Sequence, residues 1–253
     1  GMQIMIGSAK EMRSECSYAP DEKTLPLFSR EALANAMQMT AYGESELKSM
    51  LKCNAAIAAE NRLRYIRFTE PENALQAILA YNGVVYKHIG TVDFTADDFA
   101  YSGRHLWITS FLYGLLRPLD IIKCYRLEGD IILPDNGCSM FDYWKSRLTD
   151  VFIEAVKGDD GVLLDLASSE MHKLFDWRKV KRELTVIRPE FFVSKGGKQK
   201  TVVVYSKMCR GEMTGFVIKN RINDADALCG FTYEGFRYMP QESTPASPVF
   251  VME

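Results

Sequence analysis

The chain has 253 residues, of which 47 % are hydrophobic and 25 % are charged, as in an ordinary soluble globular protein. Its formal net charge of −2 argues against a general polyanion binder. No apolar run approaches the roughly 18 residues of a membrane span, so we expect no membrane partner. The segment Met2–Ile6 is short and lacks the basic lead of a signal peptide, and Gly1 is interpreted as an expression scar.

The six cysteines lie far apart and form no C-x-x-C pair. In a chain of this size, that spacing favours reduced thiols over a disulfide framework and predicts a cytoplasmic protein. The three histidines are scattered and show no metal-ligand spacing. The sequence also lacks a dinucleotide fingerprint, a P-loop and a nucleophile elbow. We therefore expect neither a metal nor a cofactor.

The first half of the chain is predicted to begin with a strand and to continue mainly as helices. Thr69–Glu72 has the pattern of a capping box with proline in the first turn. In chain order we expect a strand at 2–6, an irregular stretch at 11–29, helical structure at 30–67 broken near Tyr42 and Gly43, a helix at 69–82, a shorter helix opening at 95–98 and a buried strand at 105–112.

The second half is predicted to contain a long helix, a hairpin and several short strands. Gly158 stops the long helix, and the hairpin turns at Ser194–Lys198. In chain order we expect a helix at 139–157, a strand at 162–167, a hairpin of 184–193 and 199–206, helical structure at 207–221 and 224–228, and strands at 230–238 and 249–252.

No internal repeat, low-complexity segment or long linker divides the chain. The order of strands and helices predicts one mixed α/β (α+β) domain over residues 1–253. We expect a central mixed sheet flanked by helices, with a basic hairpin and helix region that could project as a lobe.

Residues 112–129 alternate large apolar side chains with charged ones and fit neither a helical period nor a strand alternation. We expect an ordered loop threaded through the core, and its charges make it a candidate site. Pairing with arginines is the simpler interpretation for Asp120 and Glu128. We expect the Arg126 guanidinium to be buried and bonded to Glu128, Asp120 or Glu170, so that Arg126→Ala would cost about 3–5 kcal/mol.

Four predicted strands end in polar turns, at residues 8–10, 117–128, 168–170 and 206–211. In open α/β sheets ligands bind outside the carboxyl ends of strands, so neighbouring strands would bring these turns to one cleft. Two turns also start helices, whose free N–H groups favour an anion. We predict a cleft for a phosphate or another anionic ligand, and the alternative is that these charges pair internally. The candidate cleft residues are Lys10, Arg117, Arg126, Ser168, Lys207 and Arg210.

If the cleft performs chemistry, Glu170 is the best general acid or base. Lys10 is then the best phosphate clamp or nucleophile. Neither assignment is specific, and no reaction class follows from the pair.

Residues 171–210 carry eleven basic residues against three acidic ones, a charge of +8 on an otherwise acidic chain. Such a stretch is a candidate nucleic-acid footprint. The alternative is a solvated helix and hairpin that happen to be rich in lysine. The candidate DNA contacts are Lys179, Lys195, Lys198 and Lys200.

The chain resembles the YaaA peroxide-stress family, whose members carry L-Y-G-x-L-R-P-L-D followed shortly by Y-R-L-E. Both motifs are present here, at Leu112–Asp120 and Tyr125–Glu128. The resemblance continues in A-K at 9–10, in the apolar stretch 74–80 followed by G-x-V-Y at 83–86, and in L-A-S at 166–168 with Glu170. It ends with Lys207, Arg210, Gly211 and Met213, then G-F at 230–231 and E-G at 234–235.

The resemblance implies a bacterial cytoplasmic protein that limits oxidative damage when peroxide rises, in association with lower free iron. It also implies a compact mixed α/β body that binds DNA through a basic cleft and a helix-hairpin-helix-like element.

The chain departs from the family pattern at several positions. The serine of the family's S-P-A-K is displaced here, so Ser8 is not carried over as a site residue. The loss of positive charge at Met208 and Gly215 weakens the expectation of DNA binding. The other departures are Cys124, Gly129, Asp165 and Met171.

Two hypotheses of different classes follow. In the first, the protein binds double-stranded DNA and limits iron-driven damage, which requires a basic surface joining residues 173–200 to the cleft mouth. In the second, it is an enzyme acting on a nucleotide-like or phosphorylated small molecule, which requires Glu170 within reach of Lys10 or Arg210 in a closed pocket. The sequence does not indicate an oligomeric state.

Overall fold

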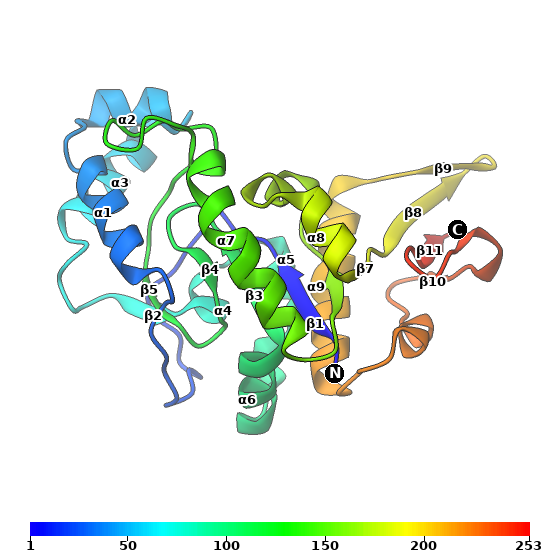
Figure 1. Cartoon of the computed structure of the whole chain (residues 1–253). Helices are drawn as coiled ribbons and strands as arrows, with labels where there is room; N and C mark the ends of the chain where they lie inside the picture. Colours follow the sequence, from blue (N-terminus) through cyan, green and yellow to red (C-terminus); the bar gives the residue numbers. More distant parts are fainter.

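Five short strands form the main sheet of the computed structural model, which describes residues 1–253 (Figure 1). Their order is β4-β3-β1-β6-β7, with β1 parallel to both β3 and β6, β6 parallel to β7, and β4 antiparallel to β3. The strands are β1 (Gln3–Ile6), β3 (Leu106–Ser110), β4 (Gly114–Leu116), β6 (Val162–Asp165) and β7 (Thr185–Ile187). The central strand β1 is buried along its whole length, as expected for a parallel strand covered on both faces.

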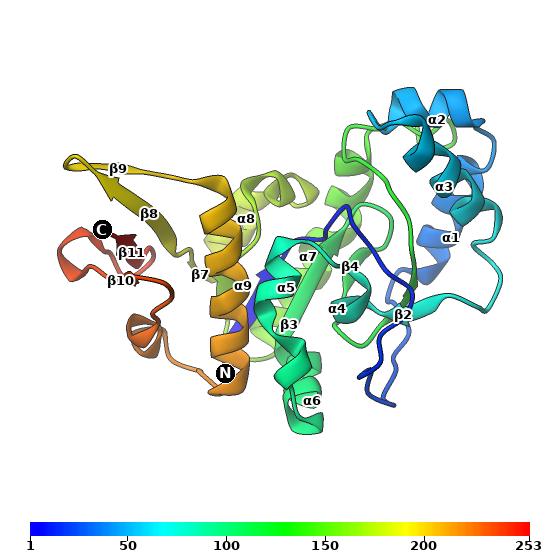
Figure 2. The same cartoon turned by 180° about the vertical axis from the view of Figure 1, so that it is seen from behind.

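Helices cover both faces of this sheet. On the face toward the reader in Figure 1 lie α7 (Met140–Lys157) and α8 (Trp177–Glu183). On the opposite face, turned forward in Figure 2, lie α5 (Val84–Ile89), α6 (Ala96–His105) and α9 (Val203–Lys219). The predicted starts of α6 and α7 are confirmed, because the side chains of Thr95 and Ser139 accept backbone N–H bonds in the first turns.

The N-terminal helices pack beside the main sheet, where they form the left part of Figure 1. They are α1 (Ser29–Met39), α2 (Glu44–Met50) and α3 (Ala55–Ile66), followed by β2 (Ala74–Gln76) and α4 (Ala77–Ala80). The predicted break near Gly43 is confirmed, but of the predicted helix at 69–82 only α4 is helical. β2 pairs there with β5 (Ile121–Lys123), and this long-range pairing outweighs the local capping pattern.

A second sheet, of order β10-β11-β8-β9, lies at the other end of the molecule. Its strands are β8 (Glu190–Lys195), β9 (Lys198–Lys200), β10 (Phe236–Tyr238) and β11 (Val249–Met252). The hairpin of β8 and β9 turns at Gly196 and Gly197, which both have positive φ, and it extends away from the body in Figures 1 and 2. The predicted hairpin and the strand at 249–252 are therefore confirmed, whereas only 236–238 of the predicted strand 230–238 is a strand.

Two predicted strands of the hairpin region have different bounds in the structure. The stretch 184–193 divides at Arg188 and Pro189, where the chain leaves the main sheet for the second one. The stretch 199–206 is a strand only to Lys200, because α9 begins at Val203. The remaining elements are the short 3-10 helices Thr91–Asp93, Ser169–Leu174, Ala225–Gly230 and Pro240–Glu242.

One hydrophobic cluster of 62 buried residues runs through the whole molecule, which forms a single compact mixed α/β domain. Residues 112–129 thread through this core as predicted, with Leu112, Leu115 and Leu116 fully buried. The segment is not a continuous loop, however, because it contains the short strands β4 and β5, which are held by pairing with β3 and β2. No helix is long and apolar enough to cross a membrane.

Candidate functional site

A cleft of about 480 Å³ opens at the carboxyl ends of β1 and β6. Its walls come from six places: the loop after β1, the start of α5, the turn after β3, the segment after β5, the turn after β6 and the first turns of α9. The cations that line it are Lys10, Lys87, Arg126, Lys207 and Arg210, and the carboxylates are Glu11, Glu128 and Glu170. Of the six cleft residues predicted from the sequence, the structure places all except Arg117 in this one cavity.

The cleft cations are largely without protein partners. Only Lys10 forms an ion pair, at 3.5 Å from Nζ to Oε1 of Glu128. The side chains of the other four cations make no ion pair or hydrogen bond within the chain. Cations that converge on a cavity without protein acceptors favour an anion from outside.

Arg126 is a cleft cation with an unpaired buried donor, a feature that it shares with Arg117 outside the cleft. Its Nε is buried and has no hydrogen-bond partner, so the predicted bond to Glu128, Asp120 or Glu170 is wrong. Its backbone is fixed nevertheless, because the hydroxyl of the buried Tyr65 donates to the Arg126 carbonyl. A buried donor without a partner is rare in folded proteins, and a bound oxyanion would satisfy it.

Lys207 and Arg210 lie three residues apart on α9 and therefore point from the same face of the helix. Burial lowers the pKa of Arg210, and the nearby Arg188 guanidinium lowers it further. The guanidinium stays charged at neutral pH, so an anion in the cleft would offset the cost of its burial. Lys207 is exposed at the cleft mouth.

Glu170 and Ser168 follow β6, as the sequence predicts, and both line the cleft. Glu170 is exposed and makes no ion pair or side-chain hydrogen bond. A general acid at neutral pH usually needs a desolvated or charge-perturbed carboxyl, and this one lies in water. The surroundings of Glu170 therefore give little support to a catalytic role.

Two tyrosines that the sequence interpretation did not single out, Tyr86 and Tyr125, line the cleft. The hydroxyl of Tyr125 shares 2.6 Å hydrogen bonds with Tyr81 and with Ser110, and Tyr86 donates to the carbonyl of Gly7 at 2.6 Å. Burial raises the pKa of Tyr125 to about 12, although the hydrogen bonds oppose this shift. The first residue of the Y-R-L-E motif, Tyr125, was the feature of the sequence from which this network could have been inferred.

Arg117 lies away from the cleft and is part of a structural cluster. Its guanidinium is 3.6 Å from Asp120, whose buried carboxylate also accepts bonds from Thr24 Oγ1 at 2.6 Å and from the Arg117 N–H at 2.8 Å. Burial raises the pKa of Asp120, against the effect of these bonds. Because β4 runs antiparallel to β3, the carboxyl end of β4 points toward the amino-terminal end of β3. It therefore points away from the carboxyl ends of β1 and β6, where the cleft opens.

The basic candidates are divided between two surfaces. Lys179 on α8 is held by Asp150 of α7 at 2.7 Å, so its charge is already paired. Lys195, Lys198 and Lys200 lie on the projecting hairpin, are exposed and make no ion pair. Among the four candidate DNA contacts, the hairpin lysines are therefore the ones whose charge is unpaired.

Comparison with known proteins identifies the family of the chain. The family described as "Peroxide stress protein YaaA" matches residues 2–242. The chain belongs to this family. It is 51 % identical over 251 residues to a UPF0246 protein of Phocaeicola vulgatus (98 % of each chain), 47 % over 254 residues to one of Bacteroides thetaiotaomicron (99 % and 98 %), and 33 % over 255 residues to one of Dinoroseobacter shibae (99 % and 94 %).

Two departures from the YaaA-family pattern are explained by packing. Gly215 is buried against α5, and a Cβ at this position would lie 2.4 Å from the carbonyl oxygen of Ile89. Its interpretation as a lost surface charge is therefore wrong. Asp165, where the family pattern has asparagine, is buried and accepts bonds from His172 Nε2 at 2.6 Å and Arg188 at 2.8 Å. Its added charge is compensated locally.

Proposed function

We propose that this YaaA-family protein limits peroxide damage by binding double-stranded DNA, with backbone phosphates in the cleft and along the hairpin. The observation that carries the proposal is the buried, unpartnered Nε of Arg126 in a cleft lined by four further cations. The planar guanidinium of arginine can donate two parallel hydrogen bonds to the oxygens of one phosphate, and several cations can bind along one DNA backbone.

The hairpin supplies a second, more exposed set of contacts. Lys195, Lys198 and Lys200 lie on the two strands of the hairpin and have no acidic partner, which suits phosphate contacts without base readout. Binding would therefore be nearly independent of DNA sequence. Gly196 and Gly197 leave the turn without side chains, so the lysines of both strands can approach a flat backbone.

Such binding would limit iron-driven damage through the counterions of DNA. A duplex carries a condensed atmosphere of cations, and every phosphate that a protein neutralises releases them. Ferrous ions held in that atmosphere would be displaced from the covered stretch, so hydroxyl radicals would form farther from the bases.

A second candidate function is supported by the size of the cleft. At about 480 Å³ it falls within the roughly 300–1,000 Å³ of small-molecule sites, so a nucleotide-like or phosphorylated substrate would fit. The exposed position of Glu170 counts against catalysis, which makes this the weaker alternative.

The salt dependence of duplex binding tests the proposal. Three hairpin lysines and one phosphate in the cleft predict a log–log slope of roughly −3 to −4. The double variant Lys195→Glu/Lys198→Glu should weaken binding equally for unrelated sequences. The control is Lys48→Glu/Arg104→Glu, which changes net charge equally at exposed positions outside the cleft and the hairpin. If no duplex binds saturably near 50 mM salt while the cleft binds inorganic phosphate or a mononucleotide, the enzyme alternative replaces the proposal.

A further inference from the structure

The first turn of α9 carries an exposed apolar patch of three consecutive residues, Val203, Val204 and Tyr205. No other run of three exposed large hydrophobic residues occurs in the chain. The ring of Tyr205 packs edge to face against Phe236, at 6.3 Å between the ring centroids. Val203 and Val204, which are 66 % and 41 % exposed, are the part of the patch most open to solvent.

The core does not depend on the two valines. α9 packs against the rest of the molecule through Ser206, Cys209 and Met213, which are buried and recur at helical spacing. Val203 and Val204 lie on another side of the helix, where their apolar surface contacts water. Burying that surface against a ligand would therefore be favourable.

The apolar patch lies between two sets of cations, and Figure 2 shows the chain passing from β9 directly into α9. Lys200, at the end of β9, precedes Val203 by three residues, so their Cα atoms lie within about 11 Å even in an extended chain. Lys207, which lines the cleft, follows Val203 by four residues and Val204 by three and so shares their face of the helix. The first turn of α9 contains no acidic residue. The two valines are thus flanked by a hairpin cation on one side and a cleft cation on the other.

The hairpin and the apolar patch are held against the same sheet. Gln199 of β9 donates to the carboxylate of Glu242 at 2.5 Å, and Lys198–Lys200 pair with β8. At the start of α9, the contact of Tyr205 with Phe236 fixes the helix to β10 of that sheet. The hairpin lysines and the valines therefore keep their relative positions before any ligand arrives.

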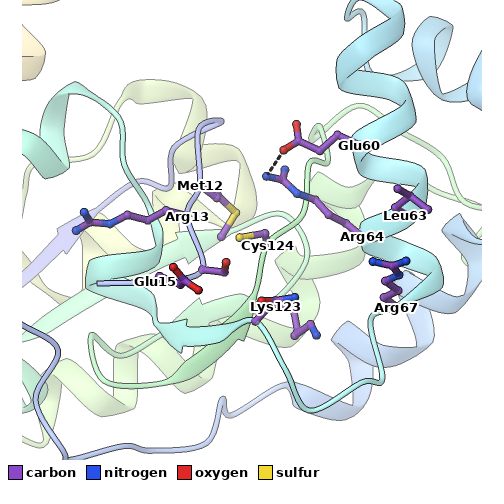
Figure 3. A pocket seen from close by; sticks show the side chains of 11 residues that line it. Met12, Arg13, Glu15, Glu60, Leu63, Arg64, Arg67, Lys123 and Cys124 are labelled. Atoms are coloured by element: carbon purple, nitrogen blue, oxygen red, sulfur yellow. Dashed lines mark hydrogen bonds and ion pairs between the residues drawn. The ribbon is translucent and has the colours of Figure 1, made fainter. Parts of the chain in front are cut away.

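A second cavity, of about 530 Å³ beside α3, shows a different use of its cations (Figure 3). Arg64 pairs there with Glu60 at 3.0 Å, the contact drawn as a dashed line, and Lys123 Nζ donates to the Glu70 carbonyl at 2.8 Å. These two charges are engaged within the chain, whereas Lys200 and Lys207 are exposed and make no ion pair. The surface around the apolar patch is therefore the better place for an anionic partner.

We propose that Val203 and Val204 form an apolar wedge that enters the minor groove of the DNA bound by the hairpin and the cleft, and bends the duplex there. The inference rests on the proposed function, because it names what lies between the two sets of phosphate contacts. The minor groove is about 6 Å wide with a phosphate backbone on each side, which suits two valines with a lysine before and after them. Apolar side chains inserted there partly unstack a base step and kink the duplex by about 20–90°.

The test measures bending by energy transfer between dyes at the two ends of a bound duplex. A duplex of roughly 30 bp is much shorter than the persistence length of about 150 bp, so it is nearly straight by itself. The intact chain should bring the dyes closer together, and Val203→Ser/Val204→Ser should abolish this change. Serine and valine have similar helix propensities, so the melting temperature should not change.

The same variant should leave the salt dependence of binding unchanged, because the log–log slope counts phosphate contacts. Its affinity should fall by less than about tenfold, because the cost of unstacking is lost together with the burial of the valines. The matched control is Val92→Ser/Val151→Ser, at valines that are 65 % and 43 % exposed and lie outside the cleft and the hairpin. The control should bend the duplex as the intact chain does.

The outcomes separate the wedge from the function on which it rests. A bend that is lost only in Val203→Ser/Val204→Ser, at an unchanged salt slope, supports the wedge. A duplex that stays straight on the intact chain, or that this variant bends equally, overturns the wedge and leaves the proposed function intact. A bend lost together with a lower slope also overturns it, because the valines would then only position the lysines. If the intact chain binds no duplex, both proposals fall together.

Discussion

The two halves of the segment 112–129 contain similar residues and are used differently. In the first half, Asp120 accepts bonds from Thr24, from the Arg117 backbone and, as an ion pair, from the Arg117 guanidinium. The buried Nε of both arginines lacks a partner, but in the second half the Arg126 guanidinium has no ion pair at all, and Glu128 is paired only with the exposed Lys10. The first half neutralises its own charge, whereas the second presents positive charge to a cavity.

The difference shows that an arginine in a motif has no fixed role. Its role depends on whether the chain carries it to the carboxyl ends of the parallel strands or to their amino ends. Arg117 follows an antiparallel strand and lies beside the carboxylate that neutralises it. Arg126 lies beyond β5, where the chain returns to the ends of the parallel strands. Substitutions in the first half should therefore affect folding, and those in the second half should affect binding.

The largest effect is expected from Asp120→Ala. The substitution removes a fully buried carboxylate and leaves the Thr24 hydroxyl and the Arg117 N–H without an acceptor. Two orphaned donors at about 1–3 kcal/mol each, with a half-exposed Arg117 that water can still solvate, predict a loss of about 3 kcal/mol. Urea unfolding followed by circular dichroism measures it. Asp120→Asn, which keeps one acceptor oxygen, should lose less, and equal losses would show that the hydrogen bonds contribute little.

Arg126→Ala should produce the reverse pattern. The guanidinium makes no bond within the protein, so its removal should change the free energy of unfolding by less than about 1 kcal/mol. The penalty of 3–5 kcal/mol expected from the sequence required a buried partner, which Arg126 does not have. Duplex affinity should fall by at least tenfold, or about 1.4 kcal/mol, because the contact is charge-assisted. A strongly destabilised variant with unchanged DNA affinity would show that Arg126, like Arg117, has a structural role.

The sequence predicted those features that depend on local chemistry. The all-buried strand β1, the caps of α6 and α7 and the glycine turn of the hairpin each follow from a few neighbouring residues. The grouping of Lys10, Ser168 and Glu170 followed from a rule about strand ends in parallel sheets, and the structure places them in one cavity.

The features that were missed depend on long-range partners. The capping pattern at Thr69 was outweighed by pairing of β2 with β5, about 47 residues later in the chain. Gly215 was interpreted as a missing charge. Its close contact with the Ile89 carbonyl depends on how α9 packs against α5, and this packing cannot be inferred from neighbouring residues. The direction of β4, which removes Arg117 from the cleft, is likewise a property of the sheet and not of the motif.

A smaller effect on stability than that of Asp120→Ala is expected from Tyr125→Phe. Tyr125 lies in the second half of the segment next to Arg126, but its hydrogen bonds are those of a structural residue. Its buried hydroxyl shares hydrogen bonds with Tyr81 and Ser110, so Tyr125→Phe should cost about 1–2 kcal/mol at pH 8. Burial raises the pKa of Tyr125 from 10.0 to about 12, so the folded state keeps a proton that the unfolded chain loses. This contribution to stability is fully present below pH 10 and is lost as the pH rises toward 12, with about 1.4 kcal/mol gone by pH 11. The gap in unfolding free energy between wild type and Tyr125→Phe should therefore narrow between pH 9 and pH 11. A constant gap over that interval would mean that the hydroxyl ionises as easily in the fold as in the unfolded chain, and that Tyr125 belongs with the open, solvated part of the cleft.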